Sequence, residues 1–150
     1  MKLNLRCWWL LFLLFLAAGC SSRPSADLTT DTKSTELTTE GEKIEFLGRY
    51  VTFKSAVSQT VFHIIYYDNS GGLVPGPSDW DIRAVMRVED VTGWIEGKTV
   101  VDSADFSWAE GLLTDELRPT SQPIYYTNQT TTIAVFEPEQ IIYFRSTTTP

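Results

Sequence analysis

The sequence predicts a small domain of the α+β class, with about six mostly antiparallel strands and two short helices. Strand-forming residues recur in short runs that turn residues separate. One run, residues 81–88, alternates between apolar and polar side chains, as a strand with one buried face does. Two other segments, 89–96 and 105–113, place apolar residues at helical spacing instead.

Six segments carry the strand pattern. Residues 60–67 are apolar on both faces, which predicts a central strand covered on two sides. In the alternating run, Ile82, Ala84, Met86 and Val88 are expected to face inward, and Asp81, Arg83 and Arg87 outward. The predicted strands are residues 49–57, 60–67, 81–88, 124–127, 131–136 and 140–145.

The two predicted helices are both short. Residues 89–96 have acids in their first turn and meet Gly97 as a stop signal. Residues 105–113 place Phe106, Ala109 and Leu113 on one face, and Asp102 or Ser103 is available as an N-cap.

The amino-terminal residues have the pattern of an export signal. Lys2 and Arg6 precede an apolar run, residues 7–18, that is shorter than the roughly 20 residues of a membrane-spanning helix. The run ends in Leu16-Ala17-Ala18-Gly19-Cys20, which resembles the lipobox of bacterial lipoproteins, with Ala17 where the commonest version has Leu.

This resemblance covers about residues 1–22 and implies a processing route. It implies cleavage between Gly19 and Cys20 and attachment of lipid to Cys20, and two or three acyl chains hold a protein at a membrane without a transmembrane helix. Ser21 follows the cysteine where Asp would imply retention, so outer-membrane localisation is implied if the source has an outer membrane. An ordinary cleaved signal, with a free thiol on Cys20, is the alternative.

The chain is predicted to have three parts: a signal peptide (1–19), a flexible linker (20–41) and a globular domain (42–150). About half of residues 21–41 are Ser or Thr, and none is aromatic. Such a segment buries too little apolar surface to offset its ordering entropy. As a flexible tether it would reach roughly 25 Å from the membrane.

Charge and cysteine content exclude several classes of function. The whole chain has a formal net charge of −7, and loss of Lys2 and Arg6 with the signal makes this −9. That balance argues against nucleic acid as a partner. The two cysteines, Cys7 and Cys20, lie in the signal and at the anchor, so the domain has no disulfide and no thiolate ligand. We expect no cofactor.

The most distinctive connection, residues 68–81, combines Gly and Pro between strong strands. It matches neither a calcium-binding loop nor a phosphate-binding loop. A hairpin loop is the simplest interpretation, and a loop that contacts a partner is the functional alternative. The candidate interaction residues are Asp68, Asn69, Gly71, Gly72, Asp79, Trp80 and Asp81.

Other chemistry-bearing residues have structural interpretations. His63, the only histidine, lies mid-strand without companions for a zinc site or a catalytic triad, so we expect a packed structural side chain. Residues 128–130 match a glycosylation acceptor but are predicted to form a turn. The candidate acid–base pairs of neighbouring carboxylates are Asp79/Asp81, Glu89/Asp90, Asp102/Asp105 and Asp115/Glu116. The candidate sugar-stacking aromatics are Trp80, Trp94, Trp108, Tyr125 and Tyr126.

Three functions stay open on the sequence. The leading hypothesis is a non-enzymatic lipoprotein of the cell envelope that contacts another protein through residues 68–81 or through a sheet edge. A binder of small ligands or glycans is the second hypothesis, and an enzyme is the third. An inhibitor of a cationic hydrolase such as lysozyme is a special case of the first, although the hallmark residues of such inhibitors are not evident.

Overall fold

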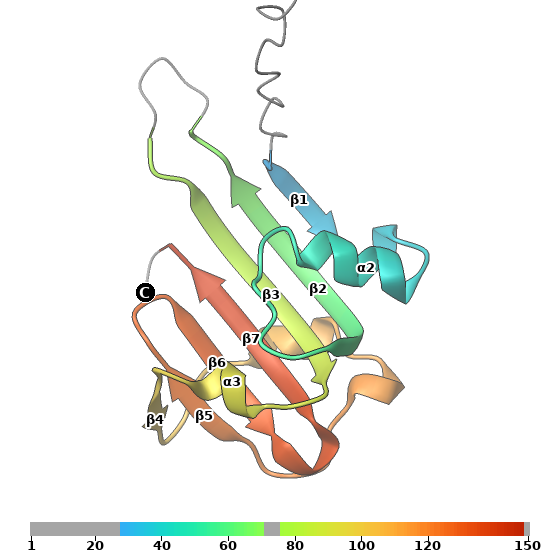
Figure 1. Cartoon of the computed structure of the whole chain (residues 1–150), viewed down its shortest axis with the longest axis vertical. Helices are drawn as coiled ribbons and strands as arrows, with labels where there is room; N and C mark the ends of the chain where they lie inside the picture. The colour runs from blue at the N-terminus through green and yellow to red at the C-terminus, as the bar shows by residue number, and fades with distance from the viewer. Residues whose placement is uncertain (1–27, 71–75, 149–150) are drawn as a thin grey trace, which may run out of the picture.

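The computed structural model describes residues 28–70 and 76–148, which build one seven-stranded antiparallel sheet. The strand order is β1-β2-β3-β7-β6-β5-β4, so the chain crosses from β3 to the far edge and returns through β5 and β6 (Figure 1). The α+β class is confirmed, with one strand more than the six predicted. The strands are β1 (Thr30–Lys33), β2 (Val57–Tyr67), β3 (Asp79–Val88), β4 (Thr99–Val101), β5 (Ile124–Thr127), β6 (Thr131–Phe136) and β7 (Ile141–Thr147).

Helices are short, and most of them are single 3₁₀ turns. Two α-helices, α2 (Glu40–Leu47) and α3 (Thr92–Ile95), lie against one face of the sheet (Figure 1), which we call the first face. The 3₁₀ helices η2 (Ser107–Gly111) and η3 (Asp115–Leu117) belong to a segment that covers part of the opposite, second face. Two further 3₁₀ turns are η1 (Ser34–Glu36) and η4 (Glu137–Glu139).

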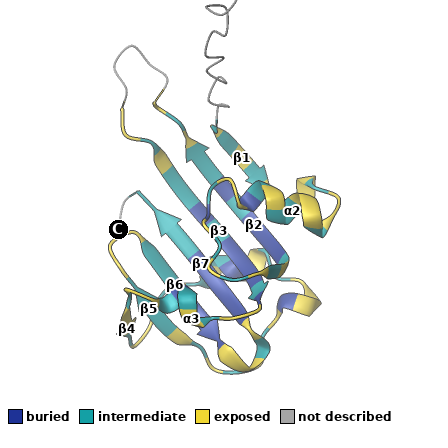
Figure 2. Ribbon diagram, viewed as in Figure 1, coloured by how far each residue is buried: buried dark blue, intermediate teal, exposed yellow. Residues whose placement is uncertain are grey.

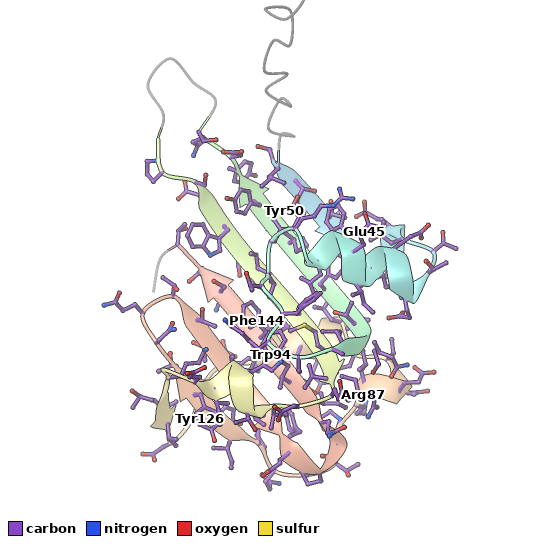
Figure 3. All side chains as sticks on the ribbon, in the orientation of Figure 1. Glu45, Tyr50, Arg87, Trp94, Tyr126 and Phe144 are labelled. Carbon is purple, nitrogen blue, oxygen red and sulfur yellow. The ribbon has the colours of Figure 1, made fainter. Side chains whose placement is uncertain are left out.

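The larger apolar core lies between the first face and the two α-helices. Trp94 of α3 is 2% exposed and packs nearly perpendicular to Phe144 of β7, with ring centroids 6.2 Å apart (Figure 3). The inward residues predicted for β3 are all buried here, which confirms their alternation. The buried residues of this core are Leu47, Val51, Phe62, Ile64, Ile82, Ala84, Met86, Val88, Trp94, Ile133, Val135, Ile142 and Phe144.

The second face is covered over only part of its area. Val61 and Val85 point to this face and are buried by the segment that carries η2 and η3, so β2 and β3 are covered on two sides there. The prediction of two covered faces for residues 60–67 therefore holds at Val61 and not at the end of β2 that carries His63 and Tyr67. Buried residues gather in one half of the sheet, whereas the far ends of β2 and β3 are intermediate or exposed (Figure 2).

The predicted linker boundary at residue 41 is wrong for the residues that are described. Residues 30–33 form β1, which pairs with β2, and α2 begins at Glu40. The Ser/Thr-rich composition predicted flexibility, but Thr39 and Glu42 form a capping box in which each side chain accepts a hydrogen bond from the other's backbone N–H (3.2 and 3.0 Å). Residues 20–27 of the predicted linker lie outside the described residues.

The strand predicted at residues 49–57 is also wrong, because the chain turns there after α2. The amides of Tyr50 and Val51 both donate to the carbonyl of Leu47 (3.0 Å each), which folds the chain back on the end of the helix. Val51 is 6% exposed, so its apolar character reflects a loop that packs into the core. Only Val57 belongs to a strand, the first residue of β2.

Both predicted helices exist but are shorter than expected. Within residues 89–96 only 92–95 are helical, and Gly97 follows with a left-handed φ of 70°. Within residues 105–113 the helix is a 3₁₀ helix, and Asp105 accepts the Ser107 amide (2.9 Å) in place of the predicted caps Asp102 and Ser103. The strands predicted at 124–127 and 131–136 match β5 and β6, and those at 60–67, 81–88 and 140–145 match β2, β3 and β7 within a few residues.

Candidate functional site

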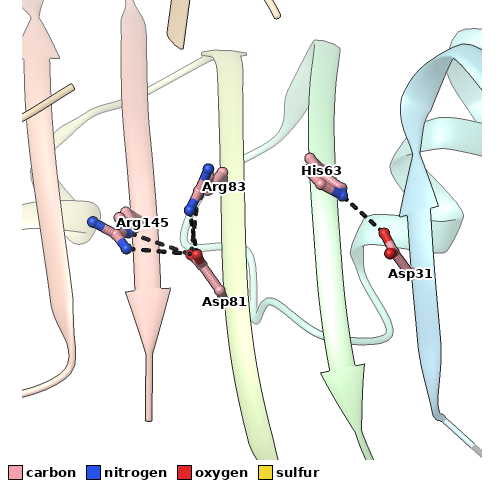
Figure 4. Close-up of polar contacts among 5 residues, drawn as sticks. All are labelled: Asp31, His63, Asp81, Arg83 and Arg145. Atoms are coloured by element: carbon pink, nitrogen blue, oxygen red, sulfur yellow. Dashed lines mark hydrogen bonds and ion pairs between the residues drawn. The ribbon is translucent and has the colours of Figure 1, made fainter. Parts of the chain in front are cut away.

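The uncovered part of the second face carries a row of charged side chains across four strands. We call it the polar strip: Asp31 of β1, His63 of β2, Asp81 and Arg83 of β3, and Arg145 of β7 (Figure 4). His63 pairs with Arg83 in the register, and Arg83 pairs with Arg145. Because paired residues point to the same side of a sheet, these side chains share one surface.

Asp81 joins two arginines at the centre of the strip. Its carboxylate accepts hydrogen bonds from Arg83 at 2.5 and 3.2 Å and from Arg145 at 3.3 and 3.5 Å. Partial burial alone would raise the pKa of Asp81, but the hydrogen bonds and positive charges of Arg83 and Arg145 outweigh it and lower this pKa. The carboxylate is therefore ionised at neutral pH and links β3 to β7.

His63 lies at the other end of the strip and contacts the edge strand. Its Nε2 is 2.8 Å from Oδ1 of Asp31, and its side chain is 23% exposed. The histidine lies mid-strand as predicted, but its polar end is bonded to Asp31 of β1. This contact adds a side-chain link to the backbone pairing of β1 with β2.

A pocket of about 350 Å³ lies where β1 ends. We call it the β1 pocket. No acidic side chain of the described residues lines it, although the chain has a formal net charge of −7. Trp108 contributes an indole Nε1–H that is buried without a hydrogen-bond partner among the residues described. The lining residues are Lys33, Ser34, Thr35, Leu37, Lys43, Val61, His63, Arg83, Trp108, Gly111, Leu112 and Thr114.

The far edge of the sheet has an apolar surface. Val100 of β4 is 61% exposed and Ile124 of β5 is 45% exposed. Tyr126 pairs with Val100 in the register and lies two residues from Ile124, so the three side chains line the first face next to each other. We call them the β4 edge patch. No other strand of the described sheet lies outside β4.

The residues predicted as one interaction loop do not lie together in a loop. Asp79, Trp80 and Asp81 belong to β3, and the Trp80 ring stacks on Tyr66 while its Nε1–H donates to Ser146 Oγ (3.0 Å). Their predicted loop position is wrong because β3 begins at Asp79.

Asp68 and Asn69 lie in the connection between β2 and β3, as predicted, and form hydrogen bonds within it. The Asp68 carboxylate accepts the Ser70 amide (2.9 Å), and the Asn69 side chain donates to the Pro77 carbonyl (2.9 Å). Gly71 and Gly72 lie outside the described residues. Whether this connection contacts a partner stays a prediction.

The aromatic residues proposed to stack on sugars do not form one platform. Trp80, Trp94 and Tyr126 belong to the first face, whereas Trp108 and Tyr125 pack on the second. Trp94 is buried. The turn predicted at residues 128–130 is confirmed, because the Asn128 side chain accepts the amides of Thr130 and Thr131 (3.1 and 2.8 Å) between β5 and β6.

In three of the four predicted carboxylate pairs, one member makes local hydrogen bonds or ion pairs. Asp81 is bound to arginines, and Asp90 and Asp105 each accept an amide two residues later (2.9 Å). Hydrogen bonds from Thr92 lower the pKa of Asp90, and hydrogen bonds from Ser107 lower that of Asp105. Within residues 28–70 and 76–148, no cluster of three His, Cys, Asp or Glu side chains is arranged to hold a metal ion.

Sequence reasoning missed Arg145 and Asp31 as site residues. The alternation of β3 places Asp81 and Arg83 on one face, but only the strand order brings Arg145 and Asp31 beside them. Trp108 was predicted as a candidate for sugar stacking, and its place in the β1 pocket was not predicted.

Gly19 and Cys20, the predicted cleavage and lipid-attachment residues, lie outside the described part of the chain. In the part that is described, no helix has the length and apolar content to cross a membrane. Comparison with known protein families, with curated proteins and with solved structures finds no match to this chain.

Proposed function

We propose that the chain is a non-enzymatic lipoprotein of the cell envelope, which is anchored through Cys20 and binds an extended segment of another envelope protein at the edge of β4. The observation that carries the proposal is the β4 edge patch. An exposed strand edge offers backbone N–H and C=O groups to an added strand, and neighbouring apolar side chains supply the buried contact.

The opposite edge is protected against such an addition. Residues 30–33 cover β2 from His63 to Tyr66, and beyond the end of β1 the Thr60 amide donates to Oε2 of Glu40 in α2 (3.0 Å). Asp31 and Lys33 place charges on the outer strand, as natural edge strands often do to prevent pairing with other chains. A partner strand therefore finds its free apolar edge at β4.

Anchoring at Cys20 fits this arrangement. The described chain begins at Leu28, whose carbonyl accepts a hydrogen bond from Tyr50 Oη (2.9 Å), and Thr29 Oγ1 accepts the Asp68 amide (3.0 Å). Only the residues from 20 to 28 separate the anchor from this end, an extended reach of about 28 Å. The anchor therefore joins the domain beside β1, and β4 is the outer strand at the opposite edge of the sheet (Figure 1).

The proposal is tested by photo-crosslinking in intact cells. A photoreactive amino acid at Val100 is expected to capture one discrete envelope protein, and the same group at Glu45, an exposed residue of α2, is expected not to. Val100→Lys combined with Ile124→Lys is expected to abolish capture by a probe placed at Thr99. Equal capture at Glu45, or capture that persists in the double-lysine variant, would contradict strand addition at β4.

The anchor is tested separately by metabolic labelling with palmitate. The unmodified chain is expected to incorporate label, to fractionate with membranes and to accumulate as a precursor under globomycin. Cys20→Ala is expected to lose the label. Label that persists in Cys20→Ala would exclude Cys20 as the lipidated residue.

A further inference from the structure

We propose that the β1 pocket binds a small organic carboxylate, an anion whose apolar body lies against the pocket wall and whose charge meets its basic side chains. This inference is independent of strand addition at β4, because the pocket and the β4 edge patch share no residue.

The first argument is the distribution of charge. Among residues 28–70 and 76–148, three Lys or Arg side chains line this one pocket together with the only histidine, and no Asp or Glu side chain does. In an acidic protein, a pocket whose described ionisable lining residues are all basic favours an anion.

The second argument is how these cations are held. Three of these basic side chains pair with a carboxylate: Lys43 with Glu40 (2.5 Å), His63 with Asp31, and Arg83 with Asp81. None of these three carboxylates lines the pocket. The acids therefore hold three basic groups in position without lining the pocket themselves. Lys33 has no ion pair within the described residues, so its ammonium is available to a ligand.

The third argument is the indole of Trp108. A buried N–H without a partner carries the desolvation cost of a donor and lacks the compensating bond. Trp108 lines the pocket, but its N–H is closed to solvent, so an acceptor oxygen of a bound carboxylate supplies that partner only when the Trp108 ring shifts as the ligand enters.

The apolar wall and the size restrict the ligand further. Leu37, Val61 and Leu112 line the pocket beside the Trp108 ring, so inorganic anions would leave much of the wall without contact. A volume of about 350 Å³ lies at the small end of the range for ligand sites. An aromatic or short aliphatic carboxylate matches both the wall and the volume.

The test uses phenylacetate as the probe and the indole N–H signals as the readout. The whole chain is labelled with ¹⁵N-tryptophan and purified in a non-ionic detergent, and Trp108→Phe identifies its peak by loss. Phenylacetate is expected to move the Trp108 indole peak downfield. Trp80 and Trp94 serve as internal references, because their indoles already donate to Ser146 and Ser55 (3.0 and 3.1 Å).

Matched compounds and variants separate charge from apolar contact. The neutral analogue 2-phenylethanol and inorganic phosphate are each expected to leave the Trp108 peak in place. Lys33→Glu is expected to weaken phenylacetate binding about tenfold, with the Trp80 and Trp94 peaks unchanged as evidence of an intact fold. Arg49→Glu, the same charge change on an exposed residue outside the pocket, is expected to alter binding less than about twofold.

An immobile Trp108 peak with phenylacetate, or an equal shift with either control compound, would overturn the proposal. Equal weakening by Lys33→Glu and Arg49→Glu would also overturn it, because a general effect of net charge would then explain the binding.

Discussion

The two outer strands of the sheet, β1 and β4, differ in the side chains that they present and in their contacts with the neighbouring strand. β1 pairs with β2 over four residues, and its Asp31 bonds His63 of β2. β4 pairs with β5 over three residues, and its central Val100 is 61% exposed. One edge is thus closed by polar contacts, and the other presents an apolar surface.

The comparison suggests different roles for the two edge strands: β1 closes the sheet, and β4 is the edge at which we propose that a partner binds. Sheet edges attract unwanted partners, and short length and charge are two of the ways in which proteins protect them. β4 is short, but no charged side chain stands among Thr99, Val100 and Val101. Short length protects β4 in part, but without charge this edge can still accept a partner strand, which is why we propose partner binding at β4.

The largest expected effect comes from the residue that anchors the chain leading into β4. Trp94 of α3 is 2% exposed and packs on Phe53 and Phe144. Trp94→Ala is expected to lower the free energy of unfolding by about 3–5 kcal/mol, measured by urea denaturation, because it leaves a large cavity in the core. Val100→Ala, on the exposed strand that follows, is expected to change it by less than about 0.5 kcal/mol.

A loss of unfolding free energy below about 1 kcal/mol for Trp94→Ala would contradict this contrast between the buried Trp94 and the exposed Val100. It would mean that the β4 side of the molecule does not depend on the first-face core for its position.

The second prediction concerns the polar strip on the β1 side. Asp81→Asn removes the charge that bridges Arg83 and Arg145, and we expect a loss of about 1–2 kcal/mol. This is below the value for a buried pair because Asp81 is 23% exposed and the arginines are 32% and 36% exposed. Asp79→Asn, an exposed neighbour on the same strand, is the matched control with little expected change.

The lowered pKa of Asp81 predicts how the stability lost in Asp81→Asn depends on pH. A lowered folded-state pKa stabilises the fold at pH values above the unfolded pKa of about 3.9, and the stabilisation is lost as pH falls through the folded value. The stability gap between the unmodified chain and Asp81→Asn should therefore be constant from pH 5 to 8 and shrink in acid. A gap that grows in acid would contradict an ionised Asp81 in the folded state.

Local pattern predicted the central strands, and long-range pairing decided the edges. Residues 60–67 and 81–88 are recognisable because burial on one or both faces fixes their side-chain pattern. β1 has the sequence Thr-Asp-Thr-Lys, which carries no apolar signal. It is a strand because the edge of β2 is available to it, and no property of residues 30–33 alone reveals that.

The candidate sites were harder to predict from the sequence than the fold was. The polar strip depends on the order β2-β3-β7, which places Arg145 beside Arg83 although they are far apart in the chain. The β1 pocket combines the end of β1 with Trp108 from the segment that covers the second face. Sequence patterns identify which residues are polar or buried, but they do not show which strands become neighbours.

The smallest expected effect on stability tests how β1 is held. Asp31→Asn removes the carboxylate charge opposite His63, and because Asp31 is 66% exposed we expect a loss of at most about 1 kcal/mol. The sharper measurement is hydrogen exchange, which reports local opening below the global unfolding energy.

In the unmodified chain, amides of β1 that bond to β2 are expected to exchange more slowly than those of β4 that bond to β5. Asp31→Asn should accelerate exchange in β1 and leave β4 unchanged, since the two edges lie at opposite ends of the strand order. Equal acceleration at both edges would show that the sheet opens as one unit. The edges would then differ only in the side chains that they present, and the assignment of binding to β4 would rest on the exposed Val100 and Ile124 alone.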